Sequence, residues 1–551
     1  MTYVGTAASE TAWTRAAANG PLLEVRRLTV DYTAHQAATR AVSDISFDIA
    51  GGEALGVMGK SGCGKTTTAL AILGVLPNTA SVHAGSIRFR GRDLLSLGES
   101  ELRKVRGSEI SMIFQEPAIM LSPVKRAGDQ VAEVIRAHSG KSWRDCRREA
   151  LSRLAEVRFD CAARVYAAYP HQLSGGQQQR VAIAQALACG PALLIADEPT
   201  ASLDLATQLE ILDLLQDLRE RLGIALLVIS HDSGVLARVA TRVIVMERGT
   251  IVEEGEIERV FNQPRNAYTR SLVTVRPSLR AVADNEPRPQ PRLEEPLVKV
   301  RGLSKRYGPR RWRKTFSVQA LTNVSLEIPA GSTVALIGES GAGKSTLAWC
   351  LLRLEPPDAG EIYFAGRDLL KMPRQEFAAI RRKIQLIFQD SAQALNPLFS
   401  AVEVVSEPLD IQRLGAKAER RARALDLMEQ VGLRAAWADR SPLEFSGGER
   451  QRLAIARALT LEPDLLILDE ALTGLDLPIQ AEILDLLGEL RAARRLTYLY
   501  ISHDLNLIAQ LADEVIVMHE GRIVERAGTG ELLRCPRHPH TQALVGARVE
   551  I

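Results

Sequence analysis

The chain has 551 residues, of which 46% are hydrophobic, 25% charged and 5% aromatic. This composition is typical of globular domains, it excludes disordered and fibrous proteins, and the length favours several domains. A formal charge of +3 gives no reason to expect nucleic-acid binding through bulk charge. Because the six cysteines lack CxxC spacing, we expect no disulfide framework, no zinc site and no iron–sulfur cluster.

No apolar run approaches the roughly 20 residues that a membrane-spanning helix needs. The first 20 residues also lack the basic segment followed by an apolar core that marks a signal peptide. We therefore expect the protein to be made and kept inside the cell.

The chain contains two copies of one unit. GKSGCGKT at 59–66 recurs as GESGAGKS at 338–345, and SGG at 174–176 recurs at 446–448. The first pair of motifs is 279 positions apart and the second pair 272, as expected for a duplicated domain with shortened loops. Each unit is long enough to bury its own core.

A segment with several prolines and few apolar residues separates the two units. Such a segment cannot bury enough surface to fold, and its prolines favour an extended chain. We predict a loose tail over 1–20, a first domain over 21–276, a proline-rich linker over 277–296 and a second domain over 297–551.

Runs of leucine and β-branched residues alternate with helical stretches along the first unit. In chain order we predict a strand at 54–58, helices at 65–76 and 177–187, a strand at 192–196, a helix at 206–221 and a strand at 225–229. Buried strands that alternate with helices predict an α/β layer with a largely parallel sheet. Ligands of such sheets bind at the carboxyl ends of the strands, where the polar motifs of this chain fall.

The repeated glycine-rich motif fits GxxxxGK[ST], a phosphate-binding loop. Its glycines allow backbone N–H groups to surround phosphates at a helix N-terminus. The lysine is expected to reach the β- and γ-phosphates, and the following hydroxyl to bind Mg²⁺. The predicted nucleotide contacts are Gly59, Lys60, Ser61, Gly62, Cys63, Gly64, Lys65, Thr66 and Thr67 in the first unit, and Gly338, Glu339, Ser340, Gly341, Ala342, Gly343, Lys344, Ser345 and Thr346 in the second.

An Asp-Glu pair ends one apolar strand in each unit, at Asp197-Glu198 and at Asp469-Glu470. Ionised carboxylates are costly to bury without a partner, and the Mg²⁺ of the nucleotide is the expected partner of each Asp. The adjacent glutamates are placed to deprotonate an attacking water, which typically contributes ~10²–10⁴-fold in rate. The residues of both Asp-Glu pairs are therefore predicted to take part in catalysis.

Two further motifs narrow the class: LSGGQ at 173–177 and FSGGE at 445–449, each followed by a helix rich in Gln and Arg. With these motifs the chain resembles the ATP-binding-cassette (ABC) family, over both units and in the same motif order. The resemblance implies two tandem P-loop cassettes, each with a mostly parallel sheet core, an antiparallel β subdomain and a helical subdomain. It also implies that ATP and Mg²⁺ are bound.

In that family two cassettes meet head to tail, and the signature of one closes on the γ-phosphate held by the other. The resemblance therefore implies two composite sites, each built from the phosphate loop and Asp-Glu pair of one unit and the signature of the other. The signature residues are Ser174, Gly175, Gly176 and Gln177, and Ser446, Gly447, Gly448 and Glu449. Departures such as Ala471, where proline is usual, remove no phosphate or metal contact, so both sites are expected to hydrolyse ATP.

Three further positions in each unit match family motifs. In the family, the glutamine senses Mg²⁺, the attacking water and the membrane partner, and the histidine contacts the γ-phosphate. The tyrosine stacks on adenine, although a tyrosine in a strand is often simple packing. The matching residues are Gln115 and Gln389, His231 and His503, and Tyr32 and Tyr307.

Within the family, the chain is most similar to the ATPases of peptide and nickel importers. The similarity lies in DSAQALNP at 390–397 and in matching tails at 263–269 and 535–541. It implies an ATPase at the cytoplasmic face of the inner membrane that works with two integral-membrane permease subunits and an extracytoplasmic solute-binding protein. Loops around Gln115 and Gln389 would pass the motion of the cassettes to short helices of the permeases.

The transported solute stays open, because specificity lies on the partner chains. Di- or oligopeptides are favoured over nickel or metal chelates, glutathione and opine-like compounds. A twin-cassette ATPase acting on ribosomes or nucleic acid is the remote alternative, disfavoured by the short proline-rich linker and the low net charge. The basic stretch Arg310–Lys314 is predicted to be a solvated loop, with a contact to lipid headgroups or a partner protein as the alternative.

Overall fold

The structure is a computed structural model, and it describes residues 20–34, 37–115, 120–201, 203–274, 296–308, 318–388, 394–502 and 504–549. The chain divides into two compact units, with the division after Thr274. The predicted tail and linker, apart from Gly20 and Pro296, lie outside the described residues, and so do the stretch Arg310–Lys314, Gln389 and His503. The limits of the two domains stay predictions.

The centre of the first unit is a six-stranded sheet that is parallel except for one edge strand. Its order is β10 (Thr250–Glu256), β9 (Arg242–Glu247), β3 (Ala54–Met58), β8 (Ala225–Ser230), β7 (Leu193–Asp197) and β6 (Ile110–Ile113). β3, β7 and β8 are buried along their whole length, as expected for Leu-, Ile- and Val-rich strands covered on both faces. The predicted α/β layer with a mostly parallel sheet is confirmed.

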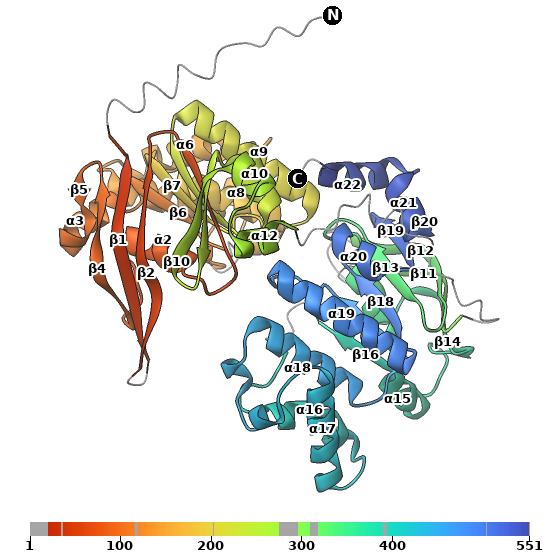
Figure 1. Cartoon of the computed structure of the whole chain (residues 1–551). Coiled ribbons are helices and arrows are strands. Elements are labelled where there is room, and N and C mark those ends of the chain that lie inside the picture. Colours follow the sequence, from red (N-terminus) through yellow and green to blue (C-terminus); the bar gives the residue numbers. More distant parts are fainter. Residues whose placement is uncertain are drawn as a thin grey trace, which may run out of the picture. The chain divides into compact units, whose positions relative to one another are not determined.

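A second, four-stranded sheet is antiparallel and supplies the β subdomain. Its order is β2 (Ala37–Ile49), β1 (Leu23–Ala34), β4 (Ala80–Phe89) and β5 (Arg92–Asp93). Leu23 and Phe89 of this sheet share one core with Leu55 and Leu227 of the parallel sheet, and helix α2 (Lys65–Leu73) contributes Ile72 to it. The strands β1, β2, β4 and β5 are drawn in red to orange (Figure 1). The helix that follows the phosphate loop is thus held in the core that joins the two sheets.

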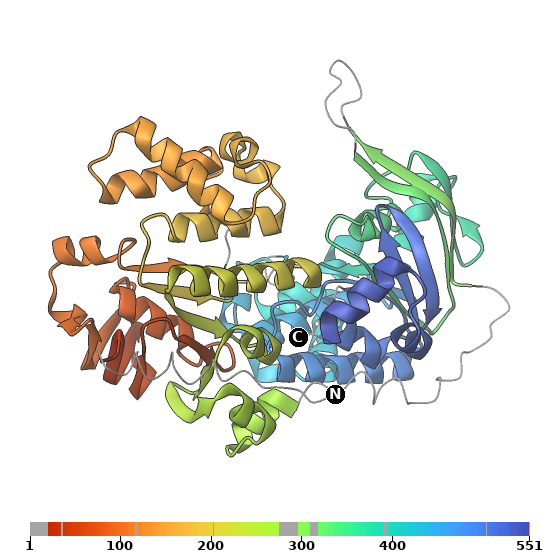
Figure 2. The ribbon, with the colours of Figure 1, turned by 90° about the horizontal axis from the view of Figure 1, so that it is seen from above.

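The other face of the parallel sheet packs on helices. Because side chains alternate along a strand, Leu194 and Leu226 belong to this second core while their neighbours Leu193 and Leu227 belong to the first. The helices of the unit are α3 (Glu99–Val105), α5 (Ala127–His138), α6 (Trp143–Glu156), α7 (Ala162–Ala167), α8 (Gly175–Ala186), α9 (Leu205–Leu222), α10 (Ser233–Val239), α11 (Ile257–Asn262) and α12 (Ala267–Thr274). α5, α6 and α7, drawn in orange, gather into a helical subdomain (Figure 2).

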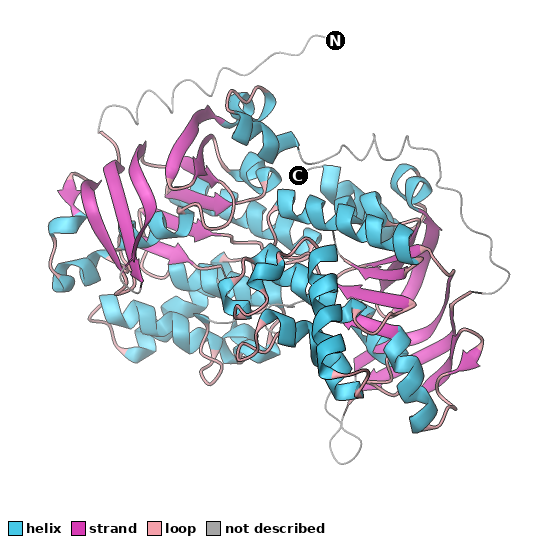
Figure 3. Ribbon diagram, turned by 60° about the horizontal axis from the view of Figure 1, so that its bottom comes forward, coloured by secondary structure: helices cyan, strands magenta, loops and turns pink. Residues whose placement is uncertain are grey.

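The second unit repeats this architecture, with helices beside both sheets (Figure 3). Its parallel sheet has the order β16 (Ile384–Ile387), β17 (Leu465–Asp469), β18 (Thr497–Ile501), β13 (Thr333–Ile337), β19 (Glu514–His519) and the antiparallel edge strand β20 (Arg522–Gly528). Its antiparallel sheet is β12 (Val318–Ile328), β11 (Val298–Tyr307), β14 (Ala359–Phe364) and β15 (Arg367–Asp368). Its helices are α14 (Lys344–Leu351), α15 (Arg374–Lys383), α16 (Ala401–Gln412), α17 (Lys417–Gln430), α18 (Gly447–Leu459), α19 (Leu477–Arg494), α20 (Leu505–Leu511), α21 (Thr529–Arg534) and α22 (Pro539–Val549).

The predicted elements of the first unit all form, with shifted ends. The helix predicted over 65–76 ends at Leu73, because Gly74 adopts a left-handed conformation with φ 64° and closes the helix. The helix predicted from 177 begins at Gly175, because the Ser174 side chain caps it. Among the described residues, no helix combines the length and the apolar character that a membrane crossing requires.

Candidate functional site

The first phosphate loop connects β3 to α2. The ammonium of Lys65 turns back onto this loop, where Nζ donates to the carbonyl oxygen of Gly59 at 2.7 Å and to that of Lys60 at 3.0 Å. Gly64 has φ 103°, and a Cβ atom there would lie 2.5 Å from the carbonyl oxygen of Ala41. Only glycine fits at that position, so the spacing of the motif has a steric reason.

The second phosphate loop, between β13 and α14, has the same geometry. Lys344 Nζ donates to the carbonyl oxygens of Gly338 and Glu339, each at 2.8 Å. Gly343 has φ 98°, and a Cβ atom there would lie 2.3 Å from the carbonyl oxygen of Ala320. In both units the loop therefore holds a lysine ammonium at the start of a helix, and the glycine before that lysine lies too close to neighbouring backbone to carry a side chain.

A hydroxyl and a buried carboxylate meet beside each loop. The Thr66 hydroxyl donates to Asp197 Oδ2 at 2.8 Å, and the Ser345 hydroxyl donates to Asp469 Oδ1 at 3.2 Å. Burial raises the pKa of both aspartates, and the hydrogen bond from the hydroxyl opposes the rise. Hydroxyl and carboxylate oxygens are the hard ligands that Mg²⁺ prefers, so these residues fit the ion expected with the nucleotide.

The two glutamates that follow these aspartates have strained backbones. Glu198 and Glu470 both have φ 48°, in the left-handed region that residues with a Cβ atom rarely adopt. The backbone N–H of Glu198 donates to the carbonyl oxygen of Ile229, and that of Glu470 to Ile501, both at 2.9 Å. Strain of this kind is concentrated at active sites. The sequence contains no signal for this strain, because the φ angle of each glutamate depends on the path of the chain from one strand to its neighbour.

The Glu198 carboxylate is held by the segment that follows β8. Its Oε1 atom accepts from the backbone N–H of His231 at 3.0 Å and lies 2.8 Å from His231 Nδ1, and the Ser230 hydroxyl donates to Oε2 at 3.4 Å. Because β3, β8 and β7 are neighbours in the sheet, the loop, the Asp-Glu pair and the histidine converge at one carboxyl edge. The structure thus brings these predicted residues of the first unit together.

Each signature motif begins a helix. Ser174 caps α8 and Ser446 caps α18, where the hydroxyl oxygen accepts from the backbone N–H of Gln177 at 3.3 Å and of Glu449 at 3.4 Å. The Gln177 and Glu449 side chains accept in return from the backbone N–H of the capping serine. Both helices therefore present a serine at an N-terminus, the geometry of an anion receptor.

The second glycine of each signature has a packing reason that sequence reasoning missed. A Cβ atom on Gly176 would lie 2.3 Å from Thr207 Cγ2 of α9, and one on Gly448 would lie 2.5 Å from Ile479 Cγ2 of α19. These glycines allow the signature helix to approach the next helix of its own unit. The preceding glycines, Gly175 and Gly447, face a leucine at 3.4 Å and 3.3 Å and are less constrained.

The remaining predicted residues are less fully described. Gln115 is exposed just after β6, whereas Gln389 and His503 lie outside the described residues. Tyr32 lies in β1, and Tyr307 ends β11, where the Lys305 ammonium is 5.2 Å from the centre of its ring and its hydroxyl is buried. The structure therefore keeps both tyrosines partly accessible in corresponding strands and leaves their contact with adenine a prediction.

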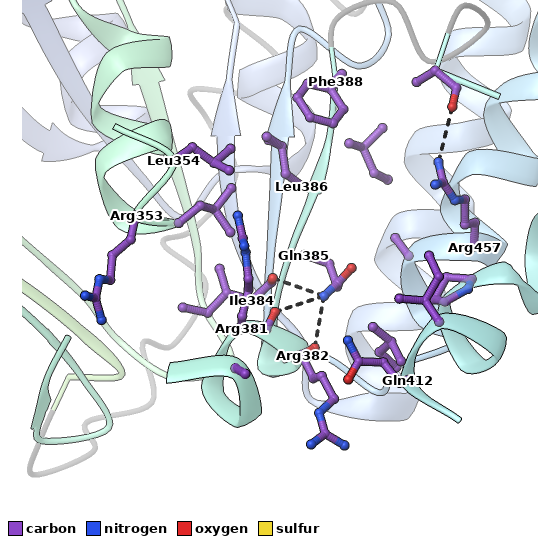
Figure 4. A pocket seen from close by; sticks show the side chains of 18 of the residues that line it. Arg353, Leu354, Arg381, Arg382, Ile384, Gln385, Leu386, Phe388, Gln412 and Arg457 are labelled. Atoms are coloured by element: carbon purple, nitrogen blue, oxygen red, sulfur yellow. Dashed lines mark hydrogen bonds between the residues drawn. The ribbon is translucent and has the colours of Figure 1, made fainter. Parts of the chain in front are cut away.

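A groove of about 740 Å³ opens in the second unit, next to Phe388. It is lined by the segment that follows α14 and by residues of α15, α16, α18 and the region of β16. Its apolar lining includes Leu354, Leu386, Phe388 and Ile411, and five arginines also line it. Figure 4 shows Leu354 and Arg353 on one side and Arg457 of α18 on the other. Gln385 Nε2 donates to three backbone carbonyl oxygens, each at 3.1 Å, and so secures the connection between α15 and β16. Phe388 and Ile411 are 48% and 69% exposed, which is unusual for large apolar residues.

Two family models match the chain. The chain matches the family model "ABC transporter" over residues 42–201 and 321–473, and the model "Oligopeptide/dipeptide transporter, C-terminal region" over residues 252–316.

Individual relatives match over nearly the whole chain. The peptidoglycan transport ATP-binding protein YejF of Agrobacterium fabrum is 41% identical over 96% of this chain and 97% of its own length. The glutathione import ATP-binding protein GsiA is 39% identical in Escherichia coli O1:K1 and in Salmonella typhimurium, over 96% of this chain and 89% of the relative. The chain therefore belongs to the ABC transporter family, as two ATP-binding cassettes in one polypeptide whose activity is ATP hydrolysis coupled to transport.

Proposed function

We propose that this chain is the ATP-hydrolysing subunit of an importer of di- or oligopeptides. The observation that carries this proposal is the match to the oligopeptide/dipeptide transporter C-terminal region next to the first cassette, in a chain of the same two-cassette length as its relatives. Glutathione is the second candidate, because relatives at 39% identity are named as glutathione importers, and glutathione is itself a tripeptide.

Each group of predicted residues would carry out one part of ATP hydrolysis. Lys65 and Lys344, with the loop amides, would hold the phosphates, and Mg²⁺ held by Thr66 with Asp197 and by Ser345 with Asp469 would neutralise their charge. Such reactions are catalysed mostly by positioning and charge stabilisation. The arrangement supports this reading because each lysine and each hydroxyl–carboxylate pair lies at the same carboxyl edge of a sheet.

The glutamates supply the proton acceptor. Glu198 and Glu470 would orient the attacking water and take its proton, and His231 would position the Glu198 carboxylate through the bonds it makes to Oε1. The strained backbone of both glutamates supports this role, because it aims the side chain independently of the preceding strand. By resemblance, the signature serines Ser174 and Ser446 would complete the phosphate site of the opposite unit.

The partners are two integral-membrane permease subunits and an extracytoplasmic solute-binding protein, with the chain peripheral at the cytoplasmic face of the inner membrane. The groove between α15, β16, α16 and α18 suits a short permease helix, since it combines exposed apolar side chains with a lining rich in arginine. A helix with one apolar face and acidic flanks would complement it.

Reconstitution tests the proposed function. The chain is assembled in vesicles with the permease pair from neighbouring reading frames, and ATP hydrolysis is measured with the receptor protein and either trialanine or glutathione. Stimulation by trialanine supports the peptide importer, and stimulation by glutathione alone selects the second candidate. If neither solute stimulates hydrolysis in vesicles that contain the assembled complex, the importer proposal is wrong.

A further inference from the structure

Three side chains from distant segments meet at the phosphate loop of the second unit. Glu339 belongs to that loop, His519 is the last residue of β19, and His540 is the second residue of α22. One carboxylate oxygen of Glu339 and one ring nitrogen of each histidine all lie within 4.8 Å of one another. We call these residues the histidine–glutamate cluster. Figure 1 shows α22 close to β19.

The distances within the cluster suit a shared metal ion better than direct hydrogen bonds. His540 Nδ1 lies 3.8 Å from Glu339 Oε1, beyond hydrogen-bond range, and the two imidazole rings are 4.0 Å apart between centres. Tetrahedral coordination with metal–ligand bonds of about 2.0–2.2 Å places neighbouring ligand atoms about 3.3–3.5 Å apart. A shift of a few tenths of an ångström would bring the carboxylate and the imidazole to that separation.

His540 is buried in a way that packing alone does not explain. Its side chain is 9% exposed, and its Nε2 atom is buried without a hydrogen-bond partner among the described residues. A buried polar atom without a partner costs free energy, and coordination of a metal ion through Nε2 would offset that cost. Burial and the neighbouring His519 lower the pKa of His540.

The first unit offers an internal comparison. The residues of the first unit that correspond to Glu339, His519 and His540 are Lys60 in the phosphate loop, Glu247 at the end of β9 and Tyr268 as the second residue of α12. There the Tyr268 hydroxyl accepts from the backbone N–H of Lys60 at 3.0 Å, so the terminal helix is bonded directly to the loop. In the second unit His540 takes the place of this tyrosine. The imidazoles of His519 and His540 and the Glu339 carboxylate occupy the positions of Glu247, Tyr268 and Lys60.

We propose that Glu339, His519 and His540 bind one Zn²⁺ ion, which joins α22 to the phosphate loop of the second unit. Two imidazoles and one carboxylate are a common ligand set for zinc, with a water in the fourth position. The site uses no cysteine, which is why cysteine spacing in the sequence did not indicate it. It is independent of the transported solute and of the proposed importer function.

Zinc titration of the full chain tests the proposal. Affinity tags are removed, metals are stripped with a chelator, and zinc binding is followed by calorimetry without nucleotide and in excess Mg²⁺. We expect one saturable zinc site per chain and a higher melting temperature when it is filled. His540→Ala should weaken binding at least about tenfold. His171→Ala, which removes an exposed histidine of the first unit, should leave the affinity unchanged.

A triple variant separates metal binding from folding. Glu339→Lys, His519→Glu and His540→Tyr together install the residues of the first unit, whose tyrosine hydroxyl bonds to the loop without a metal. This variant should keep the circular dichroism spectrum of the wild type and lose both the zinc site and the zinc-dependent rise in melting temperature. The absence of a saturable site in the wild type, or an unchanged zinc affinity in the triple variant, would overturn the proposal.

Discussion

Glu198 and His231 are bonded through both the backbone and the side chain of the histidine: the Glu198 Oε1 atom accepts from the His231 N–H at 3.0 Å and lies 2.8 Å from Nδ1. The glutamate side chain is 12% exposed and the histidine side chain 27%. A carboxylate held at two points loses little orientation when a water approaches it. The contact therefore links His231 to the expected proton acceptor.

Removal of the ring contact should slow hydrolysis less than removal of the carboxylate. His231→Ala keeps the backbone bond and loses one bond to a charged group, so we expect kcat to fall about 10–100-fold. Glu198→Gln together with Glu470→Gln should lower kcat ~10²–10⁴-fold, because both proton acceptors are lost. Steady-state ATPase assays check both values, with ATP binding measured separately to show that the loops remain intact. Undiminished hydrolysis in the double variant would contradict the assigned role.

Two glycines of the second phosphate loop form a matched pair. Gly341 and Gly343 both have positive φ, but a Cβ atom on Gly341 meets nothing within 4 Å, whereas one on Gly343 meets the Ala320 carbonyl oxygen at 2.3 Å. Gly341→Ala should cost only the backbone strain, about 1–2 kcal/mol. Gly343→Ala should displace the loop and reduce the stoichiometry of bound ATP analogue from two to one per chain. Equal binding by the two variants would show that the close approach to Ala320 is unimportant.

Asp197, a predicted Mg²⁺ ligand, is expected to lower the stability of the folded chain. Its side chain is buried, and because burial raises its pKa the ionised form destabilises the folded chain at neutral pH. Asp197→Asn keeps an oxygen that can accept from Thr66. We expect a higher melting temperature without nucleotide and a smaller stabilisation by Mg²⁺ and ATP than in the wild type. Differential scanning calorimetry with and without nucleotide checks this, and a lower melting temperature of the free variant would count against it.

A change in the arginine-lined groove should weaken docking to the permeases without changing ATP hydrolysis. Ile411→Ser removes an apolar side chain that is 69% exposed inside the groove, and burial of such a chain in a complex is worth roughly 1.5–3 kcal/mol. We expect at least about tenfold weaker association with the permeases and unchanged ATPase activity of the isolated chain.

Leu443→Ser is the matched control for the groove. Leu443 is 73% exposed and does not belong to the lining of the groove. Co-purification of the chain with its permeases compares the two variants. Equal losses of association would show that the groove has no special part in docking.

Features that are local in the chain could be predicted from the amino-acid sequence. The phosphate loops could be predicted because their defining residues lie within eight consecutive positions. The strands of the sheet could be predicted because buried parallel strands are continuous apolar runs. The Asp-Glu pairs could be placed at strand ends because each directly follows a continuous apolar run. The family resemblance is specific because each motif occurs twice.

Contacts between residues far apart in the chain became known from the fold. The contact between Thr66 and Asp197 joins positions 131 residues apart, and it exists because β3 and β7 flank β8 in the sheet. The left-handed backbone of Glu198 depends on the same strand order. The groove and the histidine–glutamate cluster assemble side chains from separate helices and strands, and hydropathy and spacing along a chain carry no information on such pairings, since they are decided by how the elements pack.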